Sequence, residues 1–164
     1  MFRASSRNRH AATVRRPARG FTIPEAMISI AVLAILVGLS LPGFRELAFA
    51  QGVKTASFDV LSGLILARSE AITRNAPVTV RPSGGDWANG WTISDSGGEL
   101  IRSQDPNSRV LIAGPGAVTY NGAGRLTGGA TSLSIQANGA RAPHSRCINI
   151  DLSGRPVAKT GGCS

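Results

Sequence analysis

The hydrophobic and polar positions divide the chain into a helical first half and a strand-rich second half. From residue 21 to residue 41 the sequence is apolar with a single charged residue, Glu25. At 1.5 Å per residue, a helix of this length measures about 31 Å, which is enough to cross the hydrocarbon core of a membrane. We therefore expect residues 21–43 to form a hydrophobic helix.

Beyond residue 43 the pattern becomes that of an amphipathic helix. Apolar residues recur at spacings of three and four, which is the period of one helix face. Glu70 and Arg74 stand four residues apart, where their side chains can pair. Asn75, followed by Pro77, indicates the end of the helix. The sequence thus predicts one helical rod of about 50 residues, with residues 44–76 as its amphipathic part.

After residue 77 the pattern changes to short β-type runs between glycine, proline, asparagine and serine clusters. The alternation of Leu133 with Ile135, and of Ile148 with Ile150, indicates strands with one buried face. The expected strands are residues 78–80, 90–94, 100–102, 109–112, 117–120, 132–135, 147–150 and 156–158. A helix followed only by strands predicts an α+β fold, with an antiparallel sheet or sandwich as the head at residues 77–164.

Two glycines and two tryptophans are expected to mark close packing. Gly52 and Gly63 each weaken the helix by about 1 kcal/mol relative to alanine, and they permit close approach of a sheet or a second helix. Trp87 and Trp91 lie at the start of an expected strand. We favour burial of both indoles in the core, and a ligand-binding surface is the alternative.

The positive charge is concentrated before the hydrophobic helix. The chain has a formal charge of +9, and residues 1–20 contain six arginines and no acid. Removal of this segment leaves 12 basic and 9 acidic residues, a charge of +3, so the high isoelectric point says little about nucleic acid. By the positive-inside bias, the N-terminus stays in the cytoplasm and the chain after residue 42 lies across the membrane.

The residues around Gly20 resemble the processing site of type IV prepilins and pseudopilins. A basic leader is followed by Gly20-Phe21-Thr22, an acid at Glu25 and an uninterrupted apolar run. An ordinary secretory signal, in contrast, is cut after its apolar run. The resemblance implies that a prepilin peptidase cuts after Gly20, that Phe21 is then N-methylated, and that the hydrophobic helix stays in the mature protein.

Glu25 is the single acid of this helix. A carboxylate inside a bilayer costs at least about 2.5–3.5 kcal/mol on insertion scales, so it needs a partner. The amine that cleavage would create on Phe21 lies four residues away on the same helix face. The family resemblance implies that Glu25 pairs with the N-terminal amine of a neighbouring subunit during filament assembly. The alternative is a solvated carboxylate at the headgroup boundary.

Phrases farther along the chain narrow the resemblance to the GspH/FimT family of minor pilins and pseudopilins. They are residues 66–79, Asn89-Gly90-Trp91 and residues 147–155. The resemblance implies a β-sandwich-like head on a helical stem, in a type IV pilus or in the pseudopilus of type II protein secretion. It also implies a single-pass protein of the bacterial inner membrane with a periplasmic head. The implied partners are other pilins or pseudopilins, the prepilin peptidase, the inner-membrane assembly platform and membrane lipid.

Cys147 and Cys163 both lie near the C-terminus, on the side expected to be periplasmic. An oxidising compartment favours a disulfide, which closes a loop of roughly 15 residues and contributes about 3 kcal/mol. Free thiols and a metal site that includes His144 are the alternatives. Zinc sites usually have cysteines two to four residues apart and a fourth ligand, and the sequence has neither. We expect no metal.

DNA binding is the alternative function. Some FimT-like pilins contact DNA through a C-terminal Gly-Arg-x-Arg motif, and this chain has Gly154-Arg155-Pro156-Val157, without the second arginine. Basic residues nearby could form a phosphate-binding patch of the salt-sensitive kind. The candidates are Arg155, Lys159, Arg146 and Arg141. An ordinary solvated face explains the same residues.

Neither catalysis nor a cofactor is expected. His10 lies in the leader, which leaves His144 as the single histidine of the mature chain. No Ser/His/Asp set or pair of carboxylates is evident. The glycines of residues 122–128 lack the spacing and the βαβ context of a dinucleotide-binding loop. We therefore expect a structural protein rather than an enzyme.

Overall fold

The computed structural model describes residues 20–140 and 144–163. It divides into two units, Met1–Ser40 and Leu41–Ser164. The helix α1 (Ile23–Arg74) has 52 residues and contributes to both units. A continuous helix of about 50 residues, as the sequence predicts, is therefore present.

In the first unit, α1 presents apolar side chains to its surroundings. Ten large apolar residues of Ile23–Leu39 are exposed, and they include neighbouring positions that point in different directions around a helix. No single helix in the described part of the chain is long and apolar enough by itself to cross a membrane. The segments Ile23–Leu39 and Gly43–Arg74 meet that requirement as a pair, by length and composition.

In the second unit, the rest of α1 is followed by strands at every position that the sequence predicts. They are β1 (Val78–Pro82), β2 (Trp91–Asp95), β3 (Leu100–Gln104), β4 (Val110–Ala113), β5 (Val118–Tyr120), β6 (Thr131–Ala137), β7 (Ser145–Ile150) and β8 (Pro156–Thr160). Two short 3-10 helices, Ser83–Gly85 and Trp87–Asn89, lie between β1 and β2.

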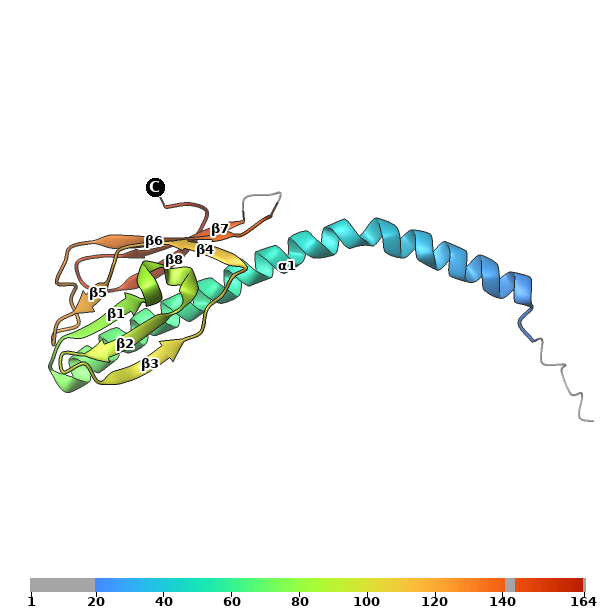
Figure 1. Ribbon diagram of the computed structural model, residues 1–164. Coiled ribbons are helices and arrows are strands. Elements are labelled where there is room, and N and C mark those ends of the chain that lie inside the picture. Colours follow the sequence, from blue (N-terminus) through green and yellow to red (C-terminus); the bar gives the residue numbers. More distant parts are fainter. Residues whose placement is uncertain (1–19, 141–143, 164) are drawn as a thin grey trace, which may run out of the picture. The chain divides into compact units, whose positions relative to one another are not determined.

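The strands form two antiparallel sheets of four strands each (Figure 1). Their orders are β3-β2-β1-β5 and β4-β6-β7-β8. The α+β class with an antiparallel head is thus confirmed. The division into two sheets depends on two pairings between strands that are not consecutive, β1 with β5 and β4 with β6.

The core lies where both sheets meet one side of α1. That side of the helix carries buried residues at spacings of three and four, and the strands contribute alternate residues, as the sequence pattern predicts. The largest fully buried side chains are Tyr120, Leu64, Ile93, Leu133, Ile135, Ile148, Ile150, Val60, Val78, Val80, Val110 and Cys147.

Both tryptophans lie in this core, which confirms the favoured interpretation of them. Trp91 packs on the helix backbone at Gly63, where an added Cβ would overlap the indole ring. Trp87 donates a hydrogen bond from Nε1 to the carbonyl of Pro115 at 2.8 Å. Gly63 therefore makes the close approach that was expected of it, whereas Gly52 has no such neighbour within 4 Å in the described part of the chain.

The helix ends as the sequence predicts. Asn75 has a positive φ of 48°, and its N–H donates to the carbonyl of Ile72 while the N–H of Ala76 donates to that of Ala71. These two bonds are the Schellman arrangement, which satisfies the last helix carbonyls. Arg74, the last residue of the helix, pairs with Glu70 one turn earlier at 2.9 Å, so the expected i,i+4 ion pair is confirmed.

Candidate functional site

The residues of the expected processing and assembly site lie at the start of α1. Gly20 and Phe21 precede the helix, Glu25 lies in its first turn, and all three are exposed. The Ser29 hydroxyl donates to the main-chain carbonyl of Glu25 at 2.8 Å, which leaves the carboxylate out of that bond. No ion pair to the Glu25 carboxylate is found among residues 20–140 and 144–163. The carboxylate is therefore accessible to a second molecule.

The amine that cleavage after Gly20 would release stands close to Glu25 along the chain. The N–H of Ala26 donates to the carbonyl of Thr22 at 3.1 Å, so the helical bonding pattern begins one residue after Phe21. Four residues along a helix correspond to about one turn. The potential amine of Phe21 thus lies just before the first helical turn, four residues from Glu25 along the chain.

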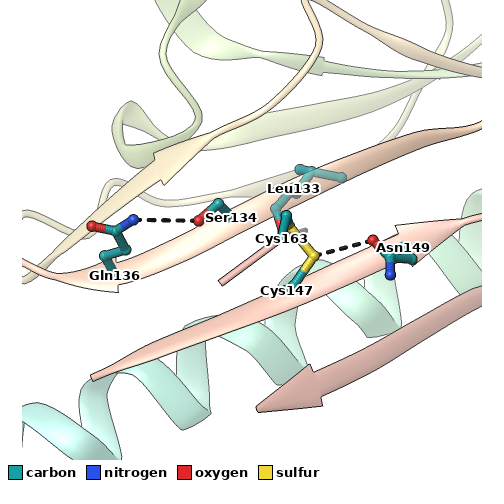
Figure 2. The surroundings of a disulfide bond; sticks show 6 residues. All are labelled: Leu133, Ser134, Gln136, Cys147, Asn149 and Cys163. Carbon is teal, nitrogen blue, oxygen red and sulfur yellow. Dashed lines mark hydrogen bonds between the residues drawn. A yellow bond between two sulfur atoms is a disulfide. The ribbon is translucent and has the colours of Figure 1, made fainter. Parts of the chain in front are cut away.

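Cys147 and Cys163 form a disulfide bond, as expected (Figure 2). Their Cα atoms are 5.0 Å apart. Cys147 is buried on β7, and the exposed Cys163 lies after the end of β8. In Figure 2 the bond lies beside Leu133 of β6, whose carbonyl oxygen is 3.4 Å from the Cys163 sulfur. The bond ties the C-terminal segment to the sheet, and it excludes both free thiols and cysteine metal ligands in this structure.

His144 contacts α1 instead of the cysteines. Its Nε2 is 3.1 Å from Oε2 of Glu46, so the segment before β7 is joined to the helix. In the described part of the chain, no three side chains of the metal-binding types lie together. Because both cysteines are in the disulfide, the alternative of a metal site formed by them and His144 is excluded in this structure.

Two of the candidate DNA-binding residues, Arg146 and Arg155, lie far from each other. Arg146 pairs with Thr160 at one end of the β7–β8 ladder. Arg155 lies in the turn before β8, beyond the other end of that ladder, where Ile150 pairs with Pro156. Four residues of strand separate these ends, which is about 13 Å. The two arginines therefore do not form one cluster.

Lys159 projects from the face of the β4-β6-β7-β8 sheet that points away from the core. It is paired with Cys147, one residue from the core residue Ile148, and successive strand residues point to opposite faces. Arg155, in contrast, borders α1. Lys159 and Arg155 therefore do not share a face of the sheet, because Arg155 precedes the first residue of β8. Arg141 lies outside the described residues.

The turn that holds Arg155 is built around the carboxylate of Asp151. This carboxylate accepts hydrogen bonds from the Ser153 hydroxyl and from the Arg155 N–H. Both bonds favour the ionised form and lower the pKa of Asp151 below its ordinary value. The main chain of the turn is thus fixed, while the Arg155 side chain is exposed.

Arg68 of α1 joins this turn to the loop between β5 and β6, and sequence analysis did not single it out. Its guanidinium donates to the carbonyls of Gly124 and Ser153 at 2.9 and 3.2 Å. Gly154 has a φ of 79°, and an added Cβ there would overlap the Gly124 carbonyl. A cation beside the buried face of the amphipathic helix is the sequence signal that identifies Arg68, because such a charge needs acceptors.

Tyr120 lies in the core beneath this junction. Its side chain is fully buried, and its hydroxyl has no hydrogen-bond partner among the described residues. Burial raises the pKa of Tyr120, and the charge of Arg68 opposes this effect. The neutral phenol is therefore the form that the folded head stabilises.

Two family models match the chain. The model of the type II transport protein GspH matches residues 56–154, and the prokaryotic N-terminal methylation motif matches residues 15–41. The second match contains Gly20, Phe21 and Glu25. The first contains the end of α1 and most of the head, and it stops before Arg155 and Cys163. Comparison with curated proteins gave no match.

Two kinds of solved structure share the fold. The type IV minor pilin FimU of Pseudomonas aeruginosa, in two crystal forms, is 20% and 22% identical, with TM-scores of 0.59 and 0.57; the match covers 68% of this chain and 95% and 99% of those chains. The minor pseudopilin EpsH of the Vibrio cholerae type 2 secretion system is 13% identical, with a TM-score of 0.52, over 67% of this chain and 96% of that chain. At these identities the likeness shows the fold.

Proposed function

Because the chain belongs to the GspH family of minor pilins and pseudopilins, we propose that it is a structural subunit that enters a bacterial envelope filament through the first part of α1. The filament is a type IV pilus or the pseudopilus of a type II secretion system. Deletion of the gene separates these two: loss of surface pili indicates the first, and loss of protein secretion with pili intact indicates the second.

The observation that carries this proposal is the exposed apolar surface of Ile23–Leu39 with Glu25 as its single acid. An apolar surface of this extent is stable only when lipid or other protein covers it. Inside a bilayer, the Glu25 carboxylate costs about 2.5–3.5 kcal/mol. Pairing with the Phe21 amine of a neighbouring subunit offsets this cost, so the charge that disfavours the free membrane helix favours its assembly.

In this proposal the prepilin peptidase cuts after Gly20, and Phe21 is then N-methylated. Residues 21–43 form the membrane and filament-core segment, and residues 44–76 with the head lie in the periplasm. The disulfide Cys147–Cys163 supports an oxidising compartment for the head. The inner-membrane assembly platform and membrane lipid are the further partners that this placement requires.

The experiment compares Glu25→Leu with Glu25→Asp in the full chain. Loss of the carboxylate should lower the amount of the protein in sheared filaments by at least about tenfold, because the pairing that offsets the insertion cost is lost. The amount in the membrane should not fall. The aspartate variant keeps the charge and should retain most of the incorporation. Immunoblots of both fractions give these amounts, and intact mass shows whether the chain starts at N-methyl-Phe21.

Two results would contradict the proposal. One is an unchanged amount of the Glu25→Leu variant in filaments. The other is a chain from native membranes whose mass still includes residues 1–20.

DNA binding is the second candidate function; Arg155 and Lys159 are both exposed but lie on different faces, so each would have to contact phosphates separately. If both contact phosphates, replacing them with alanine should weaken binding of duplex DNA and reduce the slope of log affinity against log salt by about 2. Filter binding at several salt concentrations measures this slope. An unchanged slope would exclude these two residues as phosphate contacts.

A further inference from the structure

The outer side of α1 carries an apolar stripe that the head leaves about half exposed. The stripe consists of Phe58, Ile65 and Ile72, whose exposed fractions are 54%, 52% and 50%. Seven residues correspond to nearly two helical turns, so these side chains lie one above the other. Three large apolar side chains in one exposed row of the periplasmic part of the helix indicate a surface that a partner covers.

Two residues of this stripe, Ile65 and Ile72, form one wall of a hollow. The hollow has a volume of about 460 Å³ and lies between α1 and the start of β8. It is lined by Ile65, Arg68, Ser69, Ile72, Arg155 and Pro156. Among the described residues, the lining thus combines apolar side chains with two cations and contains no acid.

The two cations of the hollow are not neutralised within the described residues by an ion pair. Arg68 donates to main-chain carbonyls, which leaves its charge in place. Arg155 forms no ion pair in the part of the chain that the structure describes. The nearby carboxylate of Asp151 attracts the Arg155 charge without forming an ion pair with the guanidinium, and it accepts hydrogen bonds from the Ser153 hydroxyl and the Arg155 N–H. The hollow therefore favours an occupant with a carboxylate beside an apolar side chain.

A carboxylate beside an exposed apolar side chain is found on the opposite side of α1, at Glu99 and Leu100. Arg74 forms ion pairs with Glu70, Asp95 and Glu99, so three carboxylates share one guanidinium there. Glu99 is 71% exposed in its side chain, and the adjacent Leu100 is 58% exposed. The tip of the β2–β3 hairpin thus carries excess negative charge next to an exposed leucine.

The hollow and the hairpin lie on different sides of the helix. Glu70 and Ile72 are two residues apart, which is a rotation of about 200° around the helix axis. Glu70 is on the side of the hairpin, because Arg74 forms ion pairs with both Glu70 and Asp95 of β2. Ile72, in contrast, lines the hollow. One copy of the chain therefore carries both halves of a complementary contact, and it cannot bring them together itself.

We propose that the hollow between α1 and β8 receives the β2–β3 hairpin of a second copy of this chain, with Leu100 against Ile65 and Ile72 and Glu99 toward Arg155. This inference rests on the proposed filament function, because assembly through the first parts of the helices gathers several copies in one filament. The contact is heterologous. In a pair of copies, one copy keeps a free hollow and the other keeps a free hairpin, so further copies can be added along a filament.

A nucleic-acid occupant explains less of this surface. Phosphates would use Arg155 and leave the apolar wall of Ile65 and Ile72 in water. A protein segment uses both the cations and the apolar wall. Charge complementarity of this kind fixes the register of a contact and suppresses wrong partners.

The test is photo-crosslinking between two differently tagged full-length copies in the same cells. A benzophenone side chain replaces Ile72 in the first copy. Irradiation should give a product of twice the subunit mass that carries both tags, with the crosslink mapped to the peptide that contains Leu100. The matched control places the benzophenone at Leu111, which is also about half exposed but lies on β4, and it should give no such product.

Charge reversal then tests the proposed pairing. Arg155→Glu in the first copy, or Glu99→Arg in the second, should each reduce the crosslinked product by at least about fivefold, which corresponds to about 1 kcal/mol. The two reversals together should restore it. Restoration also shows that neither exposed substitution unfolds the head.

Three outcomes would overturn the inference: no product that carries both tags, a product with a different subunit only, or a crosslink that Arg155→Glu leaves unchanged while it abolishes DNA binding. The N-terminal mass and the filament content of the same cells report separately on the proposed function. A processed chain in filaments without the two-tag product removes the inference and leaves that function standing.

Discussion

At Gly63 the helix backbone lies directly against an indole. A Cβ at this position would overlap the Trp91 ring, and β2, which carries Trp91, is held between β1 and β3, so the ring has little room to move. In Gly63→Ala, overpacking should cost about 1–3 kcal/mol, against about 1 kcal/mol gained in helix propensity. We expect a lower free energy of unfolding, measured by urea titration of tryptophan fluorescence in the detergent-solubilised chain.

The matched control is Gly52→Ala in the same helix. No atom outside the helix lies within 4 Å of a Cβ added at Gly52 in the described part of the chain. This substitution should therefore raise the free energy of unfolding by up to about 1 kcal/mol. Equal effects of the two substitutions would contradict the packing argument.

Tyr120 gives a direct measure of core burial, because it is the single tyrosine of the chain. Burial raises its pKa above the ordinary value, which is about 10. Folding favours the neutral phenol, so this stabilisation is complete below pH 10 and is lost as the pH rises above it. We expect phenolate absorbance to appear only together with unfolding at alkaline pH.

The control for the Tyr120 titration is Tyr120→Phe, which should give no phenolate signal. Since the hydroxyl has no partner among the described residues, this substitution should not destabilise the head at neutral pH. A phenolate midpoint near pH 10 in a head that remains folded would show that the side chain is accessible to water.

At the scale of elements, β8 depends on the disulfide as well as on its pairing. It is an edge strand bonded to β7 alone, and the bond from Cys147 to Cys163 spans 16 residues of sequence. Cys163→Ser should lower the free energy of unfolding by about 3 kcal/mol, because the unfolded chain is no longer constrained. Chemical unfolding of the variant gives this value.

Reduction of the unmodified chain provides the matched measurement for Cys163→Ser. Both changes open the same loop, so they should destabilise the head equally. A variant as stable as the oxidised chain would show that the bond constrains little in the unfolded state.

The positions of the elements could be predicted from the sequence, whereas their partners could not. Alternation shows which face of a strand is buried, and it does so for β6 and β7. It does not show that β5 pairs with β1 or that β4 pairs with β6, because those choices depend on contacts between residues far apart in the chain. The sequence therefore predicts the α+β head but not which strands share a sheet.

The same distinction holds for the sites. Gly20, Phe21 and Glu25 form a local motif, so the sequence alone identifies them. The disulfide was predictable because the chain has two cysteines. The hollow joins Ile65 of the helix to Arg155 of a distant turn, and no local pattern relates these positions. The basic residues Arg146, Arg155 and Lys159 lie near one another in the sequence, but the turn at Asp151 and the β7–β8 pairing separate them in the structure.

For the whole molecule, the two units differ in the solvent that suits their surfaces: the first exposes apolar side chains, and the second packs apolar side chains in a core. The core of the head uses residues from Val53 onward, while Ile23–Leu39 exposes its large apolar side chains. A chain without residues 1–43 should therefore partition into water when detergent and aqueous phases separate, and the mature chain should partition into detergent. Thermal unfolding of the head should change by no more than a few degrees, since a loss of about 1 kcal/mol corresponds to a few degrees in a domain of this size.

A pair of single substitutions tests the same partition without truncation. Leu33 and Leu111 are both more than half exposed, at 60% and 54%, and they belong to different units. An aspartate at the centre of a membrane helix costs about 2.5–3.5 kcal/mol, so Leu33→Asp should shift a large fraction of the mature chain into the aqueous phase. Leu111→Asp adds the same charge to a surface already in water and should leave the partition unchanged. Equal partition of the two variants would mean that the first part of α1 does not anchor the protein in lipid.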